Sequence, residues 1–239
     1  MKKLSLILIT LVISQIVNAK QPQPKDNPDL QIRQASAIFD KQLNQLIFEI
    51  TVNGIAGETT PAARGQLDEA PVLGYVFPTT LKATDVGFGE TDGIVALALT
   101  SHPDFDDTPL WDENANANYG DDGVVWHPHW VILVEDKRVP GGLSVKQFEK
   151  GDSDVILPPT NPGMPMYMDS PGYPVITHGA SIKVIVPGYR IRNKTDFSFD
   201  GVAAYMQVNT SDPEKPMLGV YTVYSIASGN LSLPYKVKK

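Results

Sequence analysis

The sequence predicts an all-β fold with one β-sandwich-like domain over residues 30–239 and two long irregular loops. Apolar residues alternate with polar ones in several short segments, and most of these segments end at Gly, Pro, Asn or Asp. No segment keeps a clear period near 3.6 over a dozen residues, which disfavours long helices. Many strands without long helices favour a sandwich, and the lack of an apparent repeat disfavours a propeller or a solenoid.

Composition narrows the functional classes. The chain has 239 residues, of which 42% are hydrophobic, so it can bury a sizeable core. It has no cysteine, which excludes disulfides, thiolate nucleophiles, cysteine-ligated zinc and iron–sulfur clusters. A net charge of −7 disfavours nucleic acid as a partner, because phosphates need a basic surface.

The first 19 residues predict a secretory signal peptide. Lys2 and Lys3 precede an apolar run from Leu4 to Val17, and Asn18-Ala19 offers a small residue for cleavage. The apolar run is shorter than the roughly 20 residues of a spanning helix, so no membrane span is expected after cleavage. We therefore expect a periplasmic or secreted protein.

Residues 20–29 are polar and rich in proline, which predicts a flexible leader. The first strand follows, with Leu46, Phe48, Ile50 and Val52 on one face and a turn at Asn53-Gly54. Further strands are predicted at 94–99, 124–134, 182–186, 202–208, 218–226 and 231–237. The stretches 101–123 and 157–179 are predicted to be irregular, and loops of this length often carry function.

The strand 124–134 predicts half of a metal site. Residues two apart in a strand share a face, so His127 and His129 would lie side by side. Pro128 cannot donate to a sheet ladder, which places this end of the strand at an edge or a bulge.

The second irregular stretch offers three thioethers, Met164, Met166 and Met168, and then His178 as a further candidate ligand. Thioether sulfur selects Cu(I), whereas imidazole suits both copper oxidation states. If the two segments converge, they would form a copper site. In the alternative interpretation, the methionines fill gaps over the core and the histidines are hydrogen-bonded within an aromatic cluster.

The first irregular stretch contains a candidate calcium loop. Oxygen-bearing side chains recur along it, and hard cations prefer oxygen ligands. The alternative is a solvated set of turns, in which each side chain bonds to nearby backbone. The candidate ligands are Asp112, Asn114, Asn116, Asn118 and Asp121.

Aromatic residues in or beside the two loops suggest a second class of function, a carbohydrate- or protein-binding module. Such residues could form a platform for a sugar ring or a partner surface. They could equally be part of the core. The platform candidates are Trp111, Trp126, Trp130 and Tyr167.

The pattern His127, His129 and Glu135 resembles the metal-binding motif of cupin-type barrels, and that resemblance implies a metal-dependent enzyme. In that family the glutamate lies one or two residues nearer to the histidines. The sequence has neither a G-x-S-x-G elbow nor a phosphate-cradling loop. A non-catalytic binding protein for a small ligand or metal ion is therefore expected.

Overall fold

The computed structural model describes residues 23–103, 114–118 and 122–239. The fold is all-β, as predicted. Its largest sheet, however, closes into a barrel, whereas the sequence predicted a β-sandwich-like domain. The signal peptide predicted over residues 1–19 lies outside the described residues. Within the described residues, no helix is long and apolar enough to cross a membrane.

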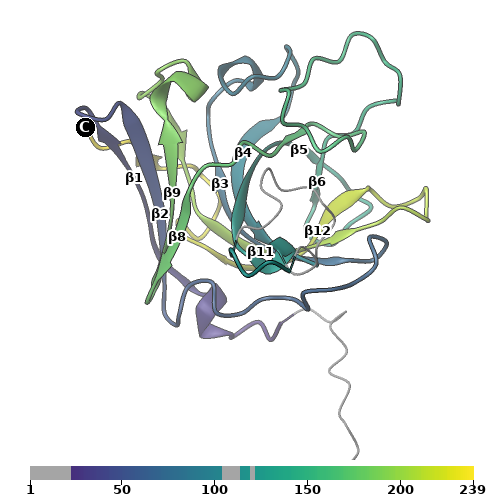
Figure 1. Cartoon of the computed structure of the whole chain (residues 1–239), viewed down its shortest axis with the longest axis horizontal. Coiled ribbons are helices and arrows are strands. Elements are labelled where there is room, and N and C mark those ends of the chain that lie inside the picture. Colours follow the sequence, from purple (N-terminus) through teal and green to yellow (C-terminus); the bar gives the residue numbers. More distant parts are fainter. Residues whose placement is uncertain (1–22, 104–113, 119–121) are drawn as a thin grey trace, which may run out of the picture.

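Six antiparallel strands form the barrel, in the order β4-β3-β11-β12-β6-β5, and pairing of β4 with β5 closes it (Figure 1). Closure removes free sheet edges and encloses an interior that side chains must fill. The strands are β3 (Pro71–Pro78), β4 (Ile94–Ser101), β5 (His127–Glu135), β6 (Leu143–Val145), β11 (Val202–Val208) and β12 (Leu218–Ile226).

A second sheet lies against one side of the barrel, in the order β1-β2-β9-β8 (Figure 1). Its central strand β2 has the predicted alternation, and Leu46, Phe48, Ile50 and Val52 are fully buried. The ring of Phe48 packs on Phe77 of the barrel at a centroid distance of 5.2 Å. The strands are β1 (Ile32–Asp40), β2 (Gln45–Val52), β8 (Val175–His178) and β9 (Ser181–Pro187).

The barrel strands that face the second sheet are buried on both faces, because one face lines the barrel interior and the other packs against that sheet. In β5, Trp130 and Ile132 belong to the core shared with the second sheet, whereas Val131 and Leu133 belong to the barrel interior. Strand β3 is buried at every position, so its sequence lacks alternation and gave no strand prediction.

The remaining elements are short. They comprise three two-residue strands and four single-turn helices. The strands are β7 (Met168–Asp169), β10 (Ser198–Phe199) and β13 (Tyr235–Lys236). The stretch 157–179, predicted to be irregular, thus contains β7 and β8, and only β13 forms within 231–237. The helices are η1 (Pro28–Leu30), η2 (Ala83–Asp85), η3 (Asp122–Val124) and η4 (Gly188–Ile191).

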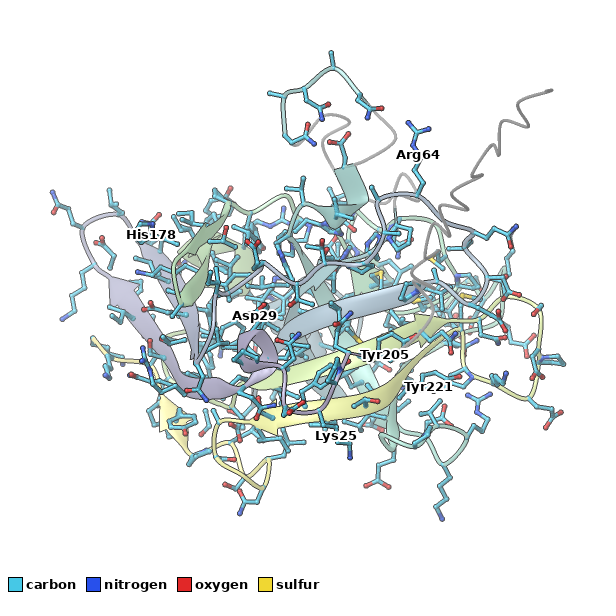
Figure 2. The ribbon with its side chains drawn as sticks, turned by 90° about the horizontal axis from the view of Figure 1, so that it is seen from below. Lys25, Asp29, Arg64, His178, Tyr205 and Tyr221 are labelled. Carbon is cyan, nitrogen blue, oxygen red and sulfur yellow. The ribbon has the colours of Figure 1, made fainter. Side chains whose placement is uncertain are left out.

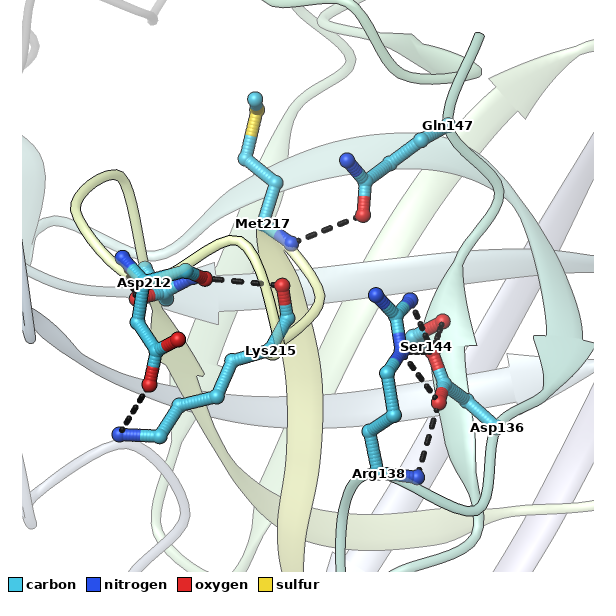
Figure 3. Close-up of polar contacts among 8 residues, drawn as sticks. Asp136, Arg138, Ser144, Gln147, Asp212, Lys215 and Met217 are labelled. Carbon is cyan, nitrogen blue, oxygen red and sulfur yellow. Dashed lines mark hydrogen bonds and ion pairs between the residues drawn. The ribbon is translucent and has the colours of Figure 1, made fainter.

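Strand β6 closes the barrel with few ladder contacts, and polar side chains reinforce it. It pairs with β12 only at Ser144↔Gly219. The carboxylate of Asp136 accepts hydrogen bonds from Arg138 and from the Ser144 hydroxyl, the latter at 2.8 Å (Figure 3). The hydrogen bonds from Arg138 hold the pKa of Asp136 well below its usual range.

Residues 23–29, part of the predicted flexible leader, pack against the fold. The Asn27 side chain caps η1 by accepting from the Asp29 backbone N–H at 2.9 Å. The Tyr75 hydroxyl donates to the Asp29 carbonyl at 2.7 Å, and burial raises the pKa of Tyr75 to about 12. The capping hydrogen bond and this contact with the barrel fix the position of a segment whose composition predicts flexibility.

Candidate metal site

Three buried histidines meet at one end of the barrel. His127 and His129 lie in β5, and His102 directly follows β4. The antiparallel register pairs Thr100 with His127 and so brings the end of β4 beside the start of β5. The three histidines are at most 4% exposed, and their candidate ligand atoms all lie within 4.8 Å of one another.

Two of the rings are oriented by backbone carbonyls. His102 Nδ1 lies 2.7 Å from the Pro103 carbonyl oxygen, and His127 Nδ1 lies 2.7 Å from that of Val125. A carbonyl oxygen only accepts, so Nδ1 carries the proton in both rings. In the neutral rings each Nε2 atom then has a lone pair.

These two Nε2 atoms lie 3.0 Å apart. Two lone pairs at this distance repel each other, and a shared proton or a cation turns the contact into an attraction. The Thr100 hydroxyl lies 3.3 Å from His127 Nε2 and adds a third polar atom. The pair is therefore arranged to hold a positive charge.

The third ring is oriented by a serine. His129 Nδ1 lies 3.0 Å from the Ser170 hydroxyl, and its ring centroid lies 4.9 Å from that of His127. Metal-bound histidines almost always use their second ring nitrogen in this way, to contact a carbonyl, carboxylate or other polar group. All three histidines have such a contact at Nδ1.

The methionine segment runs along the same end of the barrel. Met168 pairs with Val131 of β5, and the Tyr167 backbone N–H donates to the Lys146 carbonyl at 2.8 Å. The segment is extended here, so Met166 and Met168 belong to the barrel interior while Tyr167 packs in the other core.

All three methionines line one small cavity of about 30 Å³ together with His102 and His129. The two segments that the sequence singled out therefore do approach each other. Met166 and Met168 are also buried members of the barrel core, so the packing role predicted as the alternative is present as well.

Two predicted ligands lie elsewhere. His178 is exposed at the end of β8 in the second sheet, and Figure 2 shows it at an edge of the molecule. Glu135 is exposed at the opposite end of β5 from His127. A nine-residue strand spans nearly 30 Å, at about 3.3 Å per residue. The cupin-like set of His127, His129 and Glu135 therefore does not form a single site.

The described residues of the predicted aromatic platform lie in the core and not on a binding surface. Trp126 is 8% exposed and packs on Tyr75 at a centroid distance of 4.8 Å, and Trp130 is fully buried. Tyr167 is 8% exposed and packs on Phe88. These rings fill the core between the barrel and the second sheet, while Trp111 lies outside the described residues.

The described part of the candidate calcium loop consists of local turns. The backbone N–H of Asn116 donates to the Asn114 side chain at 3.1 Å, and that of Asn118 donates to the Asn116 side chain at 2.7 Å. Arg64, which is labelled in Figure 2, donates to the Asn118 side-chain oxygen at 3.2 Å. Such turns account for the alternating asparagines without a cation. Asp112 and Asp121 lie outside the described residues.

A buried carboxylate lies directly beside the site. Burial raises the pKa of Asp169, which precedes Ser170, and opposes the effects of the Thr160 hydroxyl and of Arg190. The Nη2 atom of Arg190 lies 3.6 Å from its carboxylate. Asp169 thus belongs to a polar cluster next to Ser170 and is not part of the histidine group.

Sequence reasoning missed His102 as a ligand. Its position depends on the pairing of β4 with β5, because His102 and His127 are 25 residues apart in the chain. The sequence did contain an indication, since His102 closely follows the predicted strand 94–99, two strands that neighbour in sequence usually pair, and the chain has only four histidines.

Comparisons of the chain with family models, with curated proteins and with solved structures found no match.

Proposed function

We propose that this chain is an exported, non-catalytic metal-binding protein that holds one copper ion at His102, His127 and His129. The observation that carries the proposal is the 3.0 Å contact between the Nε2 atoms of His102 and His127, whose Nδ1 atoms both face carbonyl oxygens. Nitrogen lone pairs held together in a buried position suit a transition metal.

The choice of copper rests on the adjoining thioethers. Met164, Met166 and Met168 line the same small cavity as His102 and His129. Thioether sulfur is a soft ligand that suits Cu(I). Export rests on the sequence of residues 1–19 alone, and in a chain without cysteine the methionine thioethers are the only soft sulfur ligands.

A competition titration of Cu(I) under anaerobic conditions tests the proposal, with a parallel Zn(II) titration. We expect about one Cu(I) per chain, as for a single closed site. The triple variant M164L/M166L/M168L should lose Cu(I) affinity but keep Zn(II) affinity, because Leu preserves the volume of Met and removes the sulfur.

Matched controls separate ligation from packing. Met217→Leu changes a methionine that does not line this cavity, and His178→Gln removes an exposed histidine, so both variants should bind Cu(I) and Zn(II) as the wild type does. If the triple variant keeps full Cu(I) affinity, the methionines only pack and the copper assignment is wrong. If His127→Gln changes the affinity for neither metal, the histidine site itself is wrong.

A further inference from the structure

A second, larger cavity lies inside the barrel, next to the histidines. Its volume is about 180 Å³, and strands from all around the barrel line it. Residues such as Val76, Ala98, Val131 and Val220 form its walls. Protein interiors are normally packed with few voids larger than a water molecule, so a cavity of this size is an unusual feature in a small barrel.

The size and chemistry of the cavity define what it can hold. An apolar protein cavity of about 150 Å³ stays dry and binds benzene. The lining residues here include no Asp, Glu, Lys or Arg side chain. A charged ligand would lose its hydration without compensation, so the walls select an uncharged, apolar body about the size of one substituted aromatic ring.

One end of the cavity is polar. Among the lining residues that the structure describes, only Thr100 and His129 have polar side chains. Both also line the small cavity beside His102 and the methionines, so the polar end faces the histidine site. A ligand with a single polar group would place that group here and its apolar part among the barrel side chains.

The cavity also approaches the surface. Val223 of β12 lines it and is 37% exposed, whereas most other lining residues are buried. At Val223 the cavity wall therefore reaches the protein surface.

We propose that the barrel binds a small, uncharged molecule with one aromatic ring or an equivalent branched apolar body, whose single hydroxyl group lies against Thr100 and His129. Most of the cavity lining consists of aliphatic side chains from the barrel strands, so this inference goes beyond the copper proposal and does not depend on it. It gives the histidine site a neighbouring compartment for an organic ligand.

Binding of phenol and toluene to the full chain, kept free of metal by a chelator, tests the inference by ligand-observed NMR and by titration calorimetry. Both probes should bind the wild type. Ala98→Leu places a larger side chain in the cavity and should lower the affinity for both by at least about tenfold. Ala204→Leu fills the cavity from β11 and provides a second variant if the first does not fold.

Two further variants complete the design. Thr100→Val removes the hydroxyl but keeps a similar shape. It should lower the affinity for phenol by about 2- to 10-fold and leave the affinity for toluene unchanged. Ala62→Leu, on an exposed loop, is the matched control for the filling variants and should bind both probes normally.

Failure of both probes to bind the wild type would overturn the inference, as would unchanged binding in a folded filling variant. If Thr100→Val affects neither probe, the assigned orientation of the hydroxyl is wrong. None of these outcomes depends on copper binding, because the metal is absent throughout.

Discussion

The Nε2 atoms of His102 and His127 lie 3.0 Å apart, and each ring is fixed by a 2.7 Å contact between its Nδ1 atom and a backbone carbonyl. Because the carbonyls belong to Pro103 and Val125, both rings are oriented by the main chain next to them. Neither ring can rotate without breaking a buried hydrogen bond, which costs about 1–3 kcal/mol. The site is thus oriented before any ion arrives.

Replacement of His102 should weaken metal binding as strongly as replacement of His127. Loss of an outer partner of a ligand typically costs 10- to 100-fold in affinity, so we expect His102→Gln to lose at least about 100-fold for Zn(II). Competition with a chromophoric chelator measures this, and His178→Gln is the control. Binding by His102→Gln at wild-type strength would remove this residue from the site.

Ser170→Ala should lower metal affinity by about 10- to 100-fold without removing a ligand, because Ser170 is the contact at His129 Nδ1. Ser170→Thr keeps the hydroxyl and should restore much of the affinity. Ser181→Ala, in the second sheet, removes a hydroxyl that contacts Glu49 and serves as the control. Equal affinities for all three variants would show that Ser170 does not orient the ring.

Asp136→Asn should destabilise the barrel at neutral pH by about 1–3 kcal/mol, because it loses the charge that pairs with Arg138 beside β6. The pKa of Asp136 is lowered in the fold. Its contribution is therefore fully present above the unfolded pKa of about 3.9 and is lost as the pH falls below that value.

Urea denaturation at pH 7 and at pH 3 measures this effect. We expect the difference in the free energy of unfolding between wild type and Asp136→Asn to shrink at the lower pH. A difference that stays constant or grows on acidification would contradict the assigned role of the Asp136–Arg138 pair.

Trp130→Ala should lower the free energy of unfolding by about 3–5 kcal/mol, because the indole is fully buried between the barrel and the second sheet. An exposed residue of a binding platform would change stability by less than about 0.5 kcal/mol. Denaturant titration distinguishes these values, and Leu43→Ala, where Leu43 is 63% exposed, is the control.

The parts of the fold that were predictable are those with one buried face. Strand β2 alternates because one side faces the core and the other is partly exposed, whereas β3 lies between two cores and is apolar throughout. Closure of the barrel depends on the pairing of β4 with β5 and of β3 with β11, and alternation within a strand carries no information about such partners.

The same distinction applies to the site. His127 and His129 were predictable as neighbours because their spacing alone places them on one face of a strand. His102 joins them only through the register between two strands. Trp126 and Trp130 were placed on a ligand platform because nothing local in the sequence reveals the second sheet that covers them.

The histidine site and the closed barrel also differ in the sequence separation of the residues that must come together. His102 and His127 are separated by 25 residues, whereas completing the barrel requires Val76 to pair with the much more distant Val202. Contacts that are local in sequence form faster than distant ones. Closing the shorter loop costs less conformational entropy, so bringing the imidazoles together is the less demanding of the two pairings.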